Sequence, residues 1–300
     1  MSALAQATVY GLLQGGLLAM IAVGFSLVWG VMNVINLAHG AYVLLGAYTA
    51  WELHAAWGLD PLIGAVAGGL LMFGLGYAVQ RLLVNKIVNA PIFLTLLLTF
   101  GLQLVLVQGM AVVFSADYRS IATSYASQAF TLQSFAIGDV RVPYGRLLAF
   151  GLAVLATAAL VVFAQRSRTG IAILATGMDR TAARLMGINA RHVYALTAGI
   201  AAALAGAAGA LVGLVGTFSP PDAARFTLLS FVISVLGGLG NMYGALLGGL
   251  VLGVVQAWAG QYLPGTWVNA VAFAVLVGVL LVRPAGLAGR AFYEARVEAT

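Results

Sequence analysis

The sequence predicts an all-α, polytopic integral membrane protein with about eight or nine transmembrane segments. Hydrophobic residues make up 62% of the 300 residues and charged residues only 7%, whereas soluble domains carry about 25% charged residues. Apolar runs of roughly 18 or more residues recur along the whole chain, and each could cross a hydrocarbon core of about 30 Å. Some of these segments could be discontinuous, and an internal repeat is one open alternative.

The composition also excludes several classes of protein. A soluble enzyme, a disordered chain and a fibrous protein would all need more polar residues or a different amino-acid composition. The chain has no cysteine, so disulfides, thiolate metal sites and cysteine nucleophiles are excluded. The basic residues do not cluster as nucleic-acid binding requires, and we predict neither a nucleic-acid partner nor a cofactor or metal. Residues 1–8 contain no basic residue, so they do not resemble a cleaved signal peptide.

Nine apolar segments are expected, at boundaries good to a few residues. In chain order they are 8–30, 41–57, 61–80, 92–113, 146–165, 193–216, 226–238, 243–259 and 264–282. The seventh and eighth are shorter and could be half-helices that enter the membrane and return. Many of the 38 glycines fall inside these segments, which favours close helix packing. No linker separates the segments, so we expect a single domain over 1–300.

Basic residues set the predicted orientation. Ten of the fourteen fall in one set of loops, namely Arg81, Lys86, Arg166, Arg168, Arg180, Arg184, Arg191, Arg283, Arg290 and Arg296. The other loops carry Arg119, Arg141, Arg146 and Arg225, together with Asp60, Asp117, Asp139 and Asp222. By the positive-inside rule, the first set is cytoplasmic. The N-terminus is then outside and the C-terminus cytoplasmic, which requires an odd number of crossings.

Two connections are longer than a turn. The outer one, 115–143, mixes apolar residues with Ser, Thr and Gln, and we expect it to form an extracytoplasmic loop, which could fold as a small cap. The inner one, 165–191, carries five arginines and a short helical pattern. It is expected to be a cytoplasmic loop.

The stretch 33–40 lies between two apolar segments and contains Asn33, Asn36, His39 and Gly40. Polar side chains are costly in hydrocarbon unless they are buried in protein or face a watery cavity. This cluster therefore favours a broken helix beside a translocation pathway. The alternative is a plain cytoplasmic loop whose polar residues only cap helix ends.

A second interruption, 237–244, is rich in glycine. Gly237, Gly238, Gly240 and Asn241 would let the backbone bend and expose its amide dipoles. Each interruption is followed by a Gly-Ala pair and further glycines, and paired discontinuous segments are typical of transporters built from internal repeats. Chance similarity of Gly/Ala-rich helices remains the alternative. We assign these four residues to the candidate pathway.

The stretch 176–189 predicts a short helix in the inner loop. Asp179 can cap its N-terminus, and Gly187 can close it in a left-handed conformation. Its apolar side would consist of Ala182, Ala183, Leu185 and Met186. An exposed apolar patch usually marks a contact site, although a helix resting on lipid would carry the same pattern.

The sequence contains no motif that would let the chain drive transport by itself. Its only lysine, Lys86, is not in a G-x-x-x-x-G-K-[ST] phosphate loop. Its one acid inside an apolar run, Glu52, lies near a segment end, whereas an ion-driven carrier usually has an ionisable residue at mid-membrane. Energy is thus expected from a partner.

Several strings resemble the permease subunits of branched-chain amino acid ABC importers, of the LivH type. Residues 24–40 and 45–48 look like that family's N-terminal signature, and 179–189 is similar to its cytoplasmic loop. Residues 236–249 and 283–289 look like its C-terminal signatures. The resemblance spans nearly the whole chain.

The resemblance implies a place in the bacterial inner membrane and a set of partners. These are membrane lipid, a second permease subunit that completes the pore, two cytoplasmic ATP-binding subunits and a periplasmic solute-binding protein. It also implies that the chain is not an enzyme, that 165–191 is a coupling loop, and that residues around Asp179–Gly187 contact an ATP-binding subunit. Thr181 departs from the glutamate that many such loops carry before Ala-Ala, so an acid-mediated contact is not expected there.

The preferred function is therefore ATP-driven import of branched-chain or related amino acids. Alternatives are a permease for urea, amides or aromatic acids, a self-sufficient secondary carrier, and an intramembrane enzyme that acts on lipid. The enzyme would need clustered charged or metal-binding residues, whereas His39, His54 and His192 fall in separate segments.

Overall fold

The computed structural model describes residues 2–88, 90–132 and 140–289. The described chain is almost entirely helical, with one antiparallel hairpin of two short strands. The elements are α1 Ser2–Met32, α2 His39–Trp57, α3 Pro61–Val79, the π-helical turn η1 Gln80–Val84, α4 Asn85–Ile87, α5 Ile92–Phe114, α6 Ser124–Ser127, β1 Ala129–Leu132, β2 Val140–Pro143, α7 Tyr144–Arg166, α8 Arg168–Met178, α9 Arg180–Leu185, α10 Ala190–Val215, α11 Asp222–Gly237, α12 Met242–Tyr262 and α13 Gly265–Val282.

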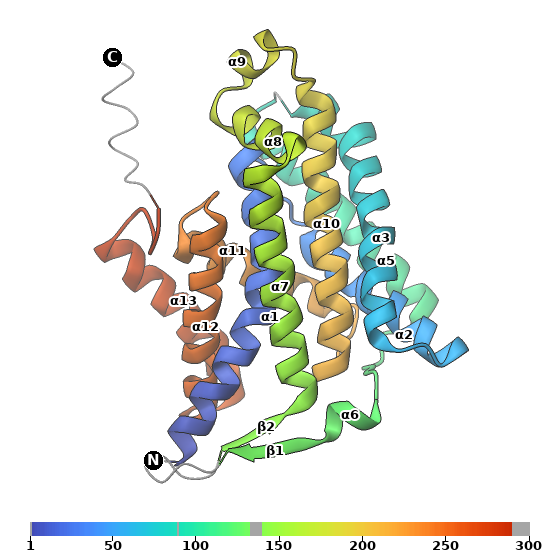
Figure 1. Cartoon of the computed structure of the whole chain (residues 1–300), viewed down its shortest axis with the longest axis vertical. Helices are drawn as coiled ribbons and strands as arrows, with labels where there is room; N and C mark the ends of the chain where they lie inside the picture. Colours follow the sequence, from blue (N-terminus) through green and yellow to red (C-terminus); the bar gives the residue numbers. More distant parts are fainter. Residues whose placement is uncertain (1, 89, 133–139, 290–300) are drawn as a thin grey trace.

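The long helices form one bundle with two distinct ends (Figure 1). At one end lie α6 and the β1–β2 hairpin, close to the start of α1; we call it the hairpin end. At the other end lie α8 and α9, which carry Arg168, Arg180 and Arg184; we call it the arginine-rich end. The basic 165–191 stretch and the described part of the 115–143 stretch thus lie at opposite ends of the bundle.

Seven helices in the described part of the chain are long and apolar enough to cross a membrane. They match seven of the nine predicted segments. The other two predictions, 41–57 and 226–238, coincide with α2 and α11, which have 19 and 16 residues and are not among the seven. The predicted count of eight or nine spans is therefore not confirmed. The 243–259 segment, expected to be short, is the 21-residue helix α12.

Helix α2 begins inside the bundle rather than at its end. The chain leaves α1 at Met32, and residues 33–38 run back along it in a non-helical conformation. The first residue of α2, His39, donates a hydrogen bond from Nε2 to the Ile21 carbonyl oxygen at 2.9 Å. Ile21 lies eleven residues before the end of α1, about 16 Å at 1.5 Å per residue. Helix α2 is thus a partial helix that starts deep in the protein.

Helix α11 is built in the same way from the opposite side. Six non-helical residues, 216–221, follow α10, just as six follow α1. Within them, Phe218 packs edge-on against Tyr48 in α2 at 5.0 Å between ring centroids. Ser219 and Asp222 then bond to each other, with the Ser219 N–H donating to Asp222 Oδ2 at 2.9 Å, and this starts α11. The pairing of the 33–40 and 237–244 stretches as a repeat is not confirmed.

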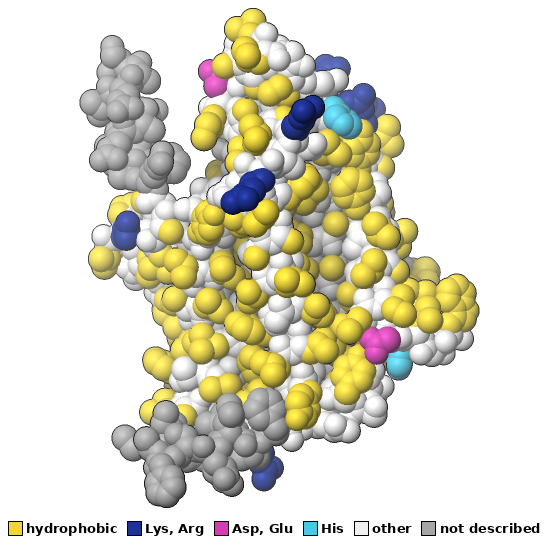
Figure 2. All heavy atoms as spheres, in the orientation of Figure 1, with side chains coloured by type: hydrophobic (Ala, Val, Ile, Leu, Met, Phe, Trp, Pro, Cys, Tyr) yellow, Lys and Arg dark blue, Asp and Glu magenta, His cyan; other side chains and the backbone are white. Residues whose placement is uncertain are grey.

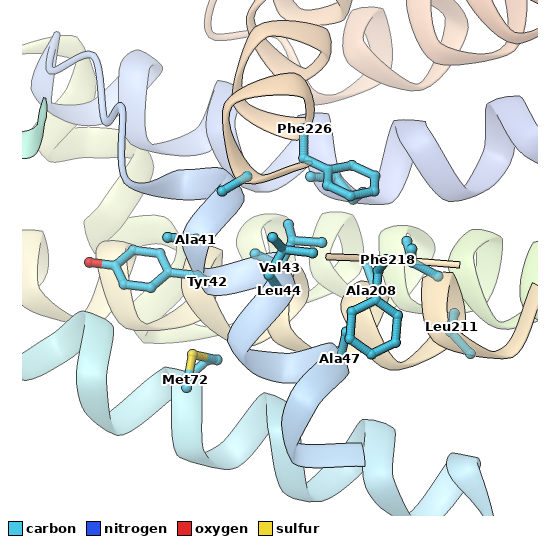
Figure 3. Close-up of a cluster of buried hydrophobic side chains, with 14 of the residues drawn as sticks. Ala41, Tyr42, Val43, Leu44, Ala47, Met72, Ala208, Leu211, Phe218 and Phe226 are labelled. Carbon is cyan, nitrogen blue, oxygen red and sulfur yellow. The ribbon is translucent and has the colours of Figure 1, made fainter. Parts of the chain in front are cut away.

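Buried side chains hold the two partial helices together. Tyr42, Leu44 and Ala47 of α2 lie in the same cluster as Met72 of α3 and Phe226 of α11. In Figure 3, α2 passes between Met72 on one side and Phe226 on the other. The core of the protein is thus centred on the discontinuous helices, whereas α5 and α13 are largely uncovered.

The tightest crossing in this core joins α2 to α10. A Cβ placed at Gly46 would overlap the backbone of Gly206. Only hydrogen fits between the two backbones, because neither helix can move aside without disturbing the core.

We expect Gly46→Val to cost about 3 kcal/mol or more, since the added atoms meet backbone rather than a flexible side chain. The midpoint of thermal unfolding in detergent should fall by roughly 10 °C. Gly74→Val is the matched control, because no atom lies within 4 Å of a Cβ there. Equal stability of the two variants would contradict the packing described for α2.

The hairpin end ties several elements together. Asp60 Oδ1 accepts a hydrogen bond from Leu62 N at 2.8 Å and so caps α3, and the Tyr125 hydroxyl donates to the same carboxylate at 3.1 Å. Burial and the Asp60 carboxylate raise the pKa of Tyr125. The Arg119 guanidinium lies over the Trp51 ring, 4.1 Å from its centroid. These contacts hold the described part of 115–143 against the bundle.

Candidate functional site

The first break is made by two asparagines with different roles. Asn33 has a positive φ of 52°, a left-handed conformation that asparagine tolerates better than most residues, and it stops α1. Asn36 is half-buried, and its Oδ1 accepts a hydrogen bond from the Ala38 N–H at 3.1 Å. This bond turns the chain into α2. The two predicted pathway asparagines therefore shape the interruption directly.

His39 and Gly40 then place the start of α2 between two other helices. His39 is 1% exposed, and its ring meets Phe25 edge-on at 5.6 Å between centroids. A Cβ at Gly40 would overlap the Ala223 carbonyl oxygen of α11. The first turns of α2 and α11 thus meet with no room for a side chain. The four residues predicted at the first break all lie at this meeting point or lead into it.

Thr227 is a residue at this point that the sequence analysis missed. Its hydroxyl donates to the Leu37 carbonyl oxygen at 2.9 Å and accepts from the Gly40 N–H at 2.9 Å. It therefore pairs the Leu37 carbonyl of the break and the N-terminal amide of α2, which has no partner within its own helix. A hydroxyl inside an otherwise apolar run was the available signal. Thr99 of α5 contributes similarly, because its hydroxyl lies 3.1 Å from the Ile35 carbonyl oxygen.

A small cavity lies beside this break. Asn36 and Tyr42 line it from one side. Gly76 of α3, Gln80 of η1 and Thr99 of α5 line it from the other. Polar groups from four elements therefore converge next to the start of α2. Such a polar interior is the surrounding that lets irregular backbone exist at membrane depth.

The second predicted group, Gly237, Gly238, Gly240 and Asn241, lies elsewhere. It forms the tight turn between α11 and α12, with φ of 105° at Gly238 and 82° at Gly240. Asn241 Oδ1 caps α12 by accepting from the Gly244 N–H at 3.1 Å. The turn is also covered by residues 283–289, because the Ala288 N–H donates to the Gly237 carbonyl oxygen at 3.0 Å. The structure therefore does not bring this group to the meeting point of α2 and α11.

The short helix predicted in 176–189 is present as α9. Asp179 Oδ1 accepts hydrogen bonds from Thr181 N at 2.7 Å and Ala182 N at 2.9 Å. Gly187 ends the turn with a positive φ of 83°. Both predicted capping roles are thus confirmed.

The apolar side chains of this loop divide into two sets. Ala183 is buried and anchors α9, whereas Leu185 and Met186 are 84% and 82% exposed. Met178, which the sequence analysis did not include, is 89% exposed beside them. We call Met178, Leu185 and Met186 the loop patch. In Figure 2, hydrophobic side chains cover the protruding tip that α9 forms in Figure 1.

The loop is joined to the rest of the bundle through Gly30 of α1. A Cβ at Gly177 would lie 2.9 Å from the Gly30 carbonyl oxygen. From another side, a Cβ at Gly30 would lie 2.9 Å from Gly240 Cα. Gly30 is thus in close contact with α8 and with the α11–α12 turn, three residues before Asn33. Gly30 is therefore the point at which α1 contacts both the 165–191 loop and the α11–α12 turn.

This fold defines a class of protein: a multi-pass, all-helical membrane protein in which α2 and α11 start deep in the bundle. Comparison with known proteins then gives its family. The family model described as "Branched-chain amino acid transport system / permease component" matches residues 7–280. The chain belongs to this family.

Two relatives illustrate the similarity. The chain is 32% identical over 294 residues to the high-affinity branched-chain amino acid transport system permease protein BraD of Pseudomonas aeruginosa, covering 95% of each chain. It is 31% identical over 289 residues to the LivH protein of the same description from Salmonella typhimurium, covering 93% of this chain and 94% of the relative. No solved structure matches the chain. The family and the seven apolar helices support a multi-pass protein of the bacterial inner membrane.

Proposed function

We propose that this chain is a permease subunit of an ATP-driven importer for branched-chain or related amino acids. A second permease subunit would complete the translocation pathway. The observation that carries the proposal is the meeting of α2 and α11, two partial helices whose first turns touch at Gly40 and Ala223. Broken helices that start within the membrane are typical of transporter binding sites, which supports a pathway beside this meeting point.

In this proposal Asn33, Asn36, His39 and Gly40 act by holding the first break open beside the pathway. The α11–α12 turn, with Gly237, Gly238, Gly240 and Asn241, acts at a distance as a joint. It lies against Gly30 and so could transmit movement of the 165–191 loop to the break.

The 165–191 loop is proposed as the coupling element. Asp179 and Gly187 fix the shape of α9, Ala182 and Ala183 lie on it, and Leu185 and Met186 are its exposed contacts. One of two cytoplasmic ATP-binding subunits would bind the loop patch, and the pair would supply the energy. A periplasmic binding protein would deliver the solute at the hairpin end. The large exposed apolar area at the tip of the loop supports a docking role.

The orientation follows from the charge pattern: the hairpin end lies outside and the arginine-rich end in the cytoplasm. The prediction places Arg119 outside and Arg184 inside. Because Arg119 packs on Trp51, the neighbouring residue Tyr118, which is 73% exposed, is the better labelling site. Single cysteines in Tyr118→Cys and Arg184→Cys should react with an impermeant maleimide from opposite faces of the membrane. Reaction of both from one face would contradict the orientation.

Uptake measurements test the function itself. Deletion of the gene should abolish high-affinity uptake of radiolabelled leucine by intact cells, and the plasmid-borne chain should restore it. Competition by isoleucine, valine, phenylalanine, urea and fructose then defines the solute. Fructose is included because the chain is 29% identical over 267 residues to the fructose import permease protein FrcC of Rhizobium meliloti. Unchanged leucine uptake after deletion, with loss of another solute's uptake, would redirect the proposal to that solute.

A further inference from the structure

A second polar feature lies away from the breaks, at the hairpin end. A cavity of about 410 Å³ lies between α1, α7, α11, α12 and α13, a size typical of small-molecule sites. Gln6, Tyr10 and Gln14 line it from one face of α1. Gln6 and Gln14 are eight helical steps apart, so the cavity follows α1 for about 12 Å from the hairpin end inward.

Two arginines face this cavity. Arg146 lies in the first turn of α7 and Arg225 in the first turn of α11. Cations at helix N-termini are unfavourable for the helix itself, because the dipole there is already positive. No Asp or Glu is among the described residues that line the cavity. The nearest acid in the sequence, Asp222, is occupied by the Ser219 hydroxyl and amide.

A buried amide completes the site. Gln256 of α12 is 8% exposed and lines the same cavity. Its Nε2 has no hydrogen-bond partner, and a buried amide donor without an acceptor costs about 1–3 kcal/mol. Arg146, meanwhile, is oriented by the Tyr10 ring, with its Cζ 4.7 Å from the ring centroid. The cavity therefore presents two guanidinium groups and an unused amide donor.

We infer that this cavity binds the carboxylate of a small organic solute. Guanidinium groups bind carboxylates through paired, charge-assisted hydrogen bonds, and Gln256 supplies a further donor. Arg225 lies in the same first turn of α11 as Ala223, which meets Gly40. The cavity therefore adjoins the start of α11. This inference rests on the proposed function, because it takes the solute to be the transported amino acid.

A single cysteine tests the site in the complete transporter. The chain has no cysteine, and a Cβ at Gly260 meets only Val268, at 3.8 Å. Gly260, which lines the cavity, can therefore be changed to Cys. In membrane vesicles, L-leucine should slow labelling of Gly260→Cys by a neutral maleimide, whereas L-leucinamide, which lacks the carboxylate, should not. Equal protection by both, or protection by neither, would overturn the inference.

Arginine variants supply the second arm. Adding Arg225→Gln to Gly260→Cys should raise the leucine concentration for half-protection at least tenfold. Arg141→Gln, an exposed arginine at the same end that does not line the cavity, should leave it unchanged. An unaltered labelling rate without leucine shows that the cavity is intact. If Arg225→Gln leaves the leucine concentration for half-protection unchanged, the inference is overturned. It is also overturned if anionic phospholipid, rather than leucine, slows the labelling of Gly260→Cys.

Uptake by the same vesicles separates this inference from the proposed function. If the vesicles take up leucine but leucine does not protect Gly260→Cys from labelling, the inferred carboxylate site is contradicted and the proposed permease function is not. Absence of leucine uptake with the unmodified chain would instead remove the proposed function.

Discussion

The double change Asn33→Leu/Asn36→Leu is expected to abolish solute uptake while the chain still inserts into the membrane. Leucine in the left-handed conformation of residue 33 costs about 1–2 kcal/mol. Leucine at 36 removes the acceptor of the Ala38 N–H, which costs about 1–3 kcal/mol if that group stays buried. Both changes favour a continuous α1 and oppose the return of the chain to Ile21. The start of α2 would lose its place beside α11.

Uptake of radiolabelled leucine by cells with matched membrane levels of the chain measures this effect, and we expect at least a hundredfold loss. Asn33→Gly/Asn36→Ser is the matched control, because glycine accepts the left-handed conformation and serine keeps a hydrogen-bond acceptor. That variant should retain most uptake. Normal uptake in the leucine variant would show that 33–40 is an ordinary loop and would remove these residues from the pathway. Solute affinity of the periplasmic binding protein should be unaffected in every variant.

His39 allows a finer distinction at the same place. Its Nε2 donates to the Ile21 carbonyl oxygen, and the amide of glutamine can donate the same bond. His39→Gln should therefore reduce uptake by no more than a few-fold if the side chain only positions α2. A loss as large as that of the double leucine variant would indicate a specific need for imidazole.

The second large effect is expected at the loop patch. Leu185→Asp/Met186→Asp should reduce ATP-driven uptake at least tenfold and prevent ATP-binding subunits from co-purifying with the chain. Both side chains are more than four-fifths exposed, so the change does not disturb the bundle. In a docked complex, however, two buried carboxylates without partners would cost several kcal/mol.

The exchange Leu185→Met/Met186→Leu is the matched control for this variant. It keeps the patch apolar and nearly constant in volume, so coupling should survive. Gly187→Asp tests the shape of the loop, because a non-glycine residue at φ 83° is strained. Normal uptake and normal ATP hydrolysis in the aspartate variant would exclude the loop as the coupling element.

Local signals made much of this architecture predictable. The nine apolar segments match nine helices. For seven of them, length and hydrophobicity reflect the membrane directly. Asp179 and Gly187 were assigned correctly because caps depend on neighbouring residues only. The asparagines at 33 and 36 were singled out for a different reason, because polar side chains are costly in hydrocarbon.

What the sequence could not provide was the depth at which a helix starts. Nothing in 41–57 shows that α2 begins beside Ile21, because that depends on a contact between segments. The second break, 216–221, was missed since Ser219, the two prolines that follow it and Asp222 look like an ordinary helix start. Gly237, Gly238 and Gly240 were predicted to form the second interruption instead, whereas they form the tight turn between α11 and α12. Long-range pairing, as between Thr227 and Gly40, has no signature in a single sequence.

The most direct test of the central claim is uptake by proteoliposomes that contain the purified transporter with this chain. Our account predicts that leucine accumulates only with ATP on the arginine-rich side and binding protein on the hairpin side, and that a protonophore has no effect. Omitting this chain should abolish accumulation. Leucine accumulation by this chain alone, without ATP and driven by a proton gradient, would contradict the account and identify a secondary carrier.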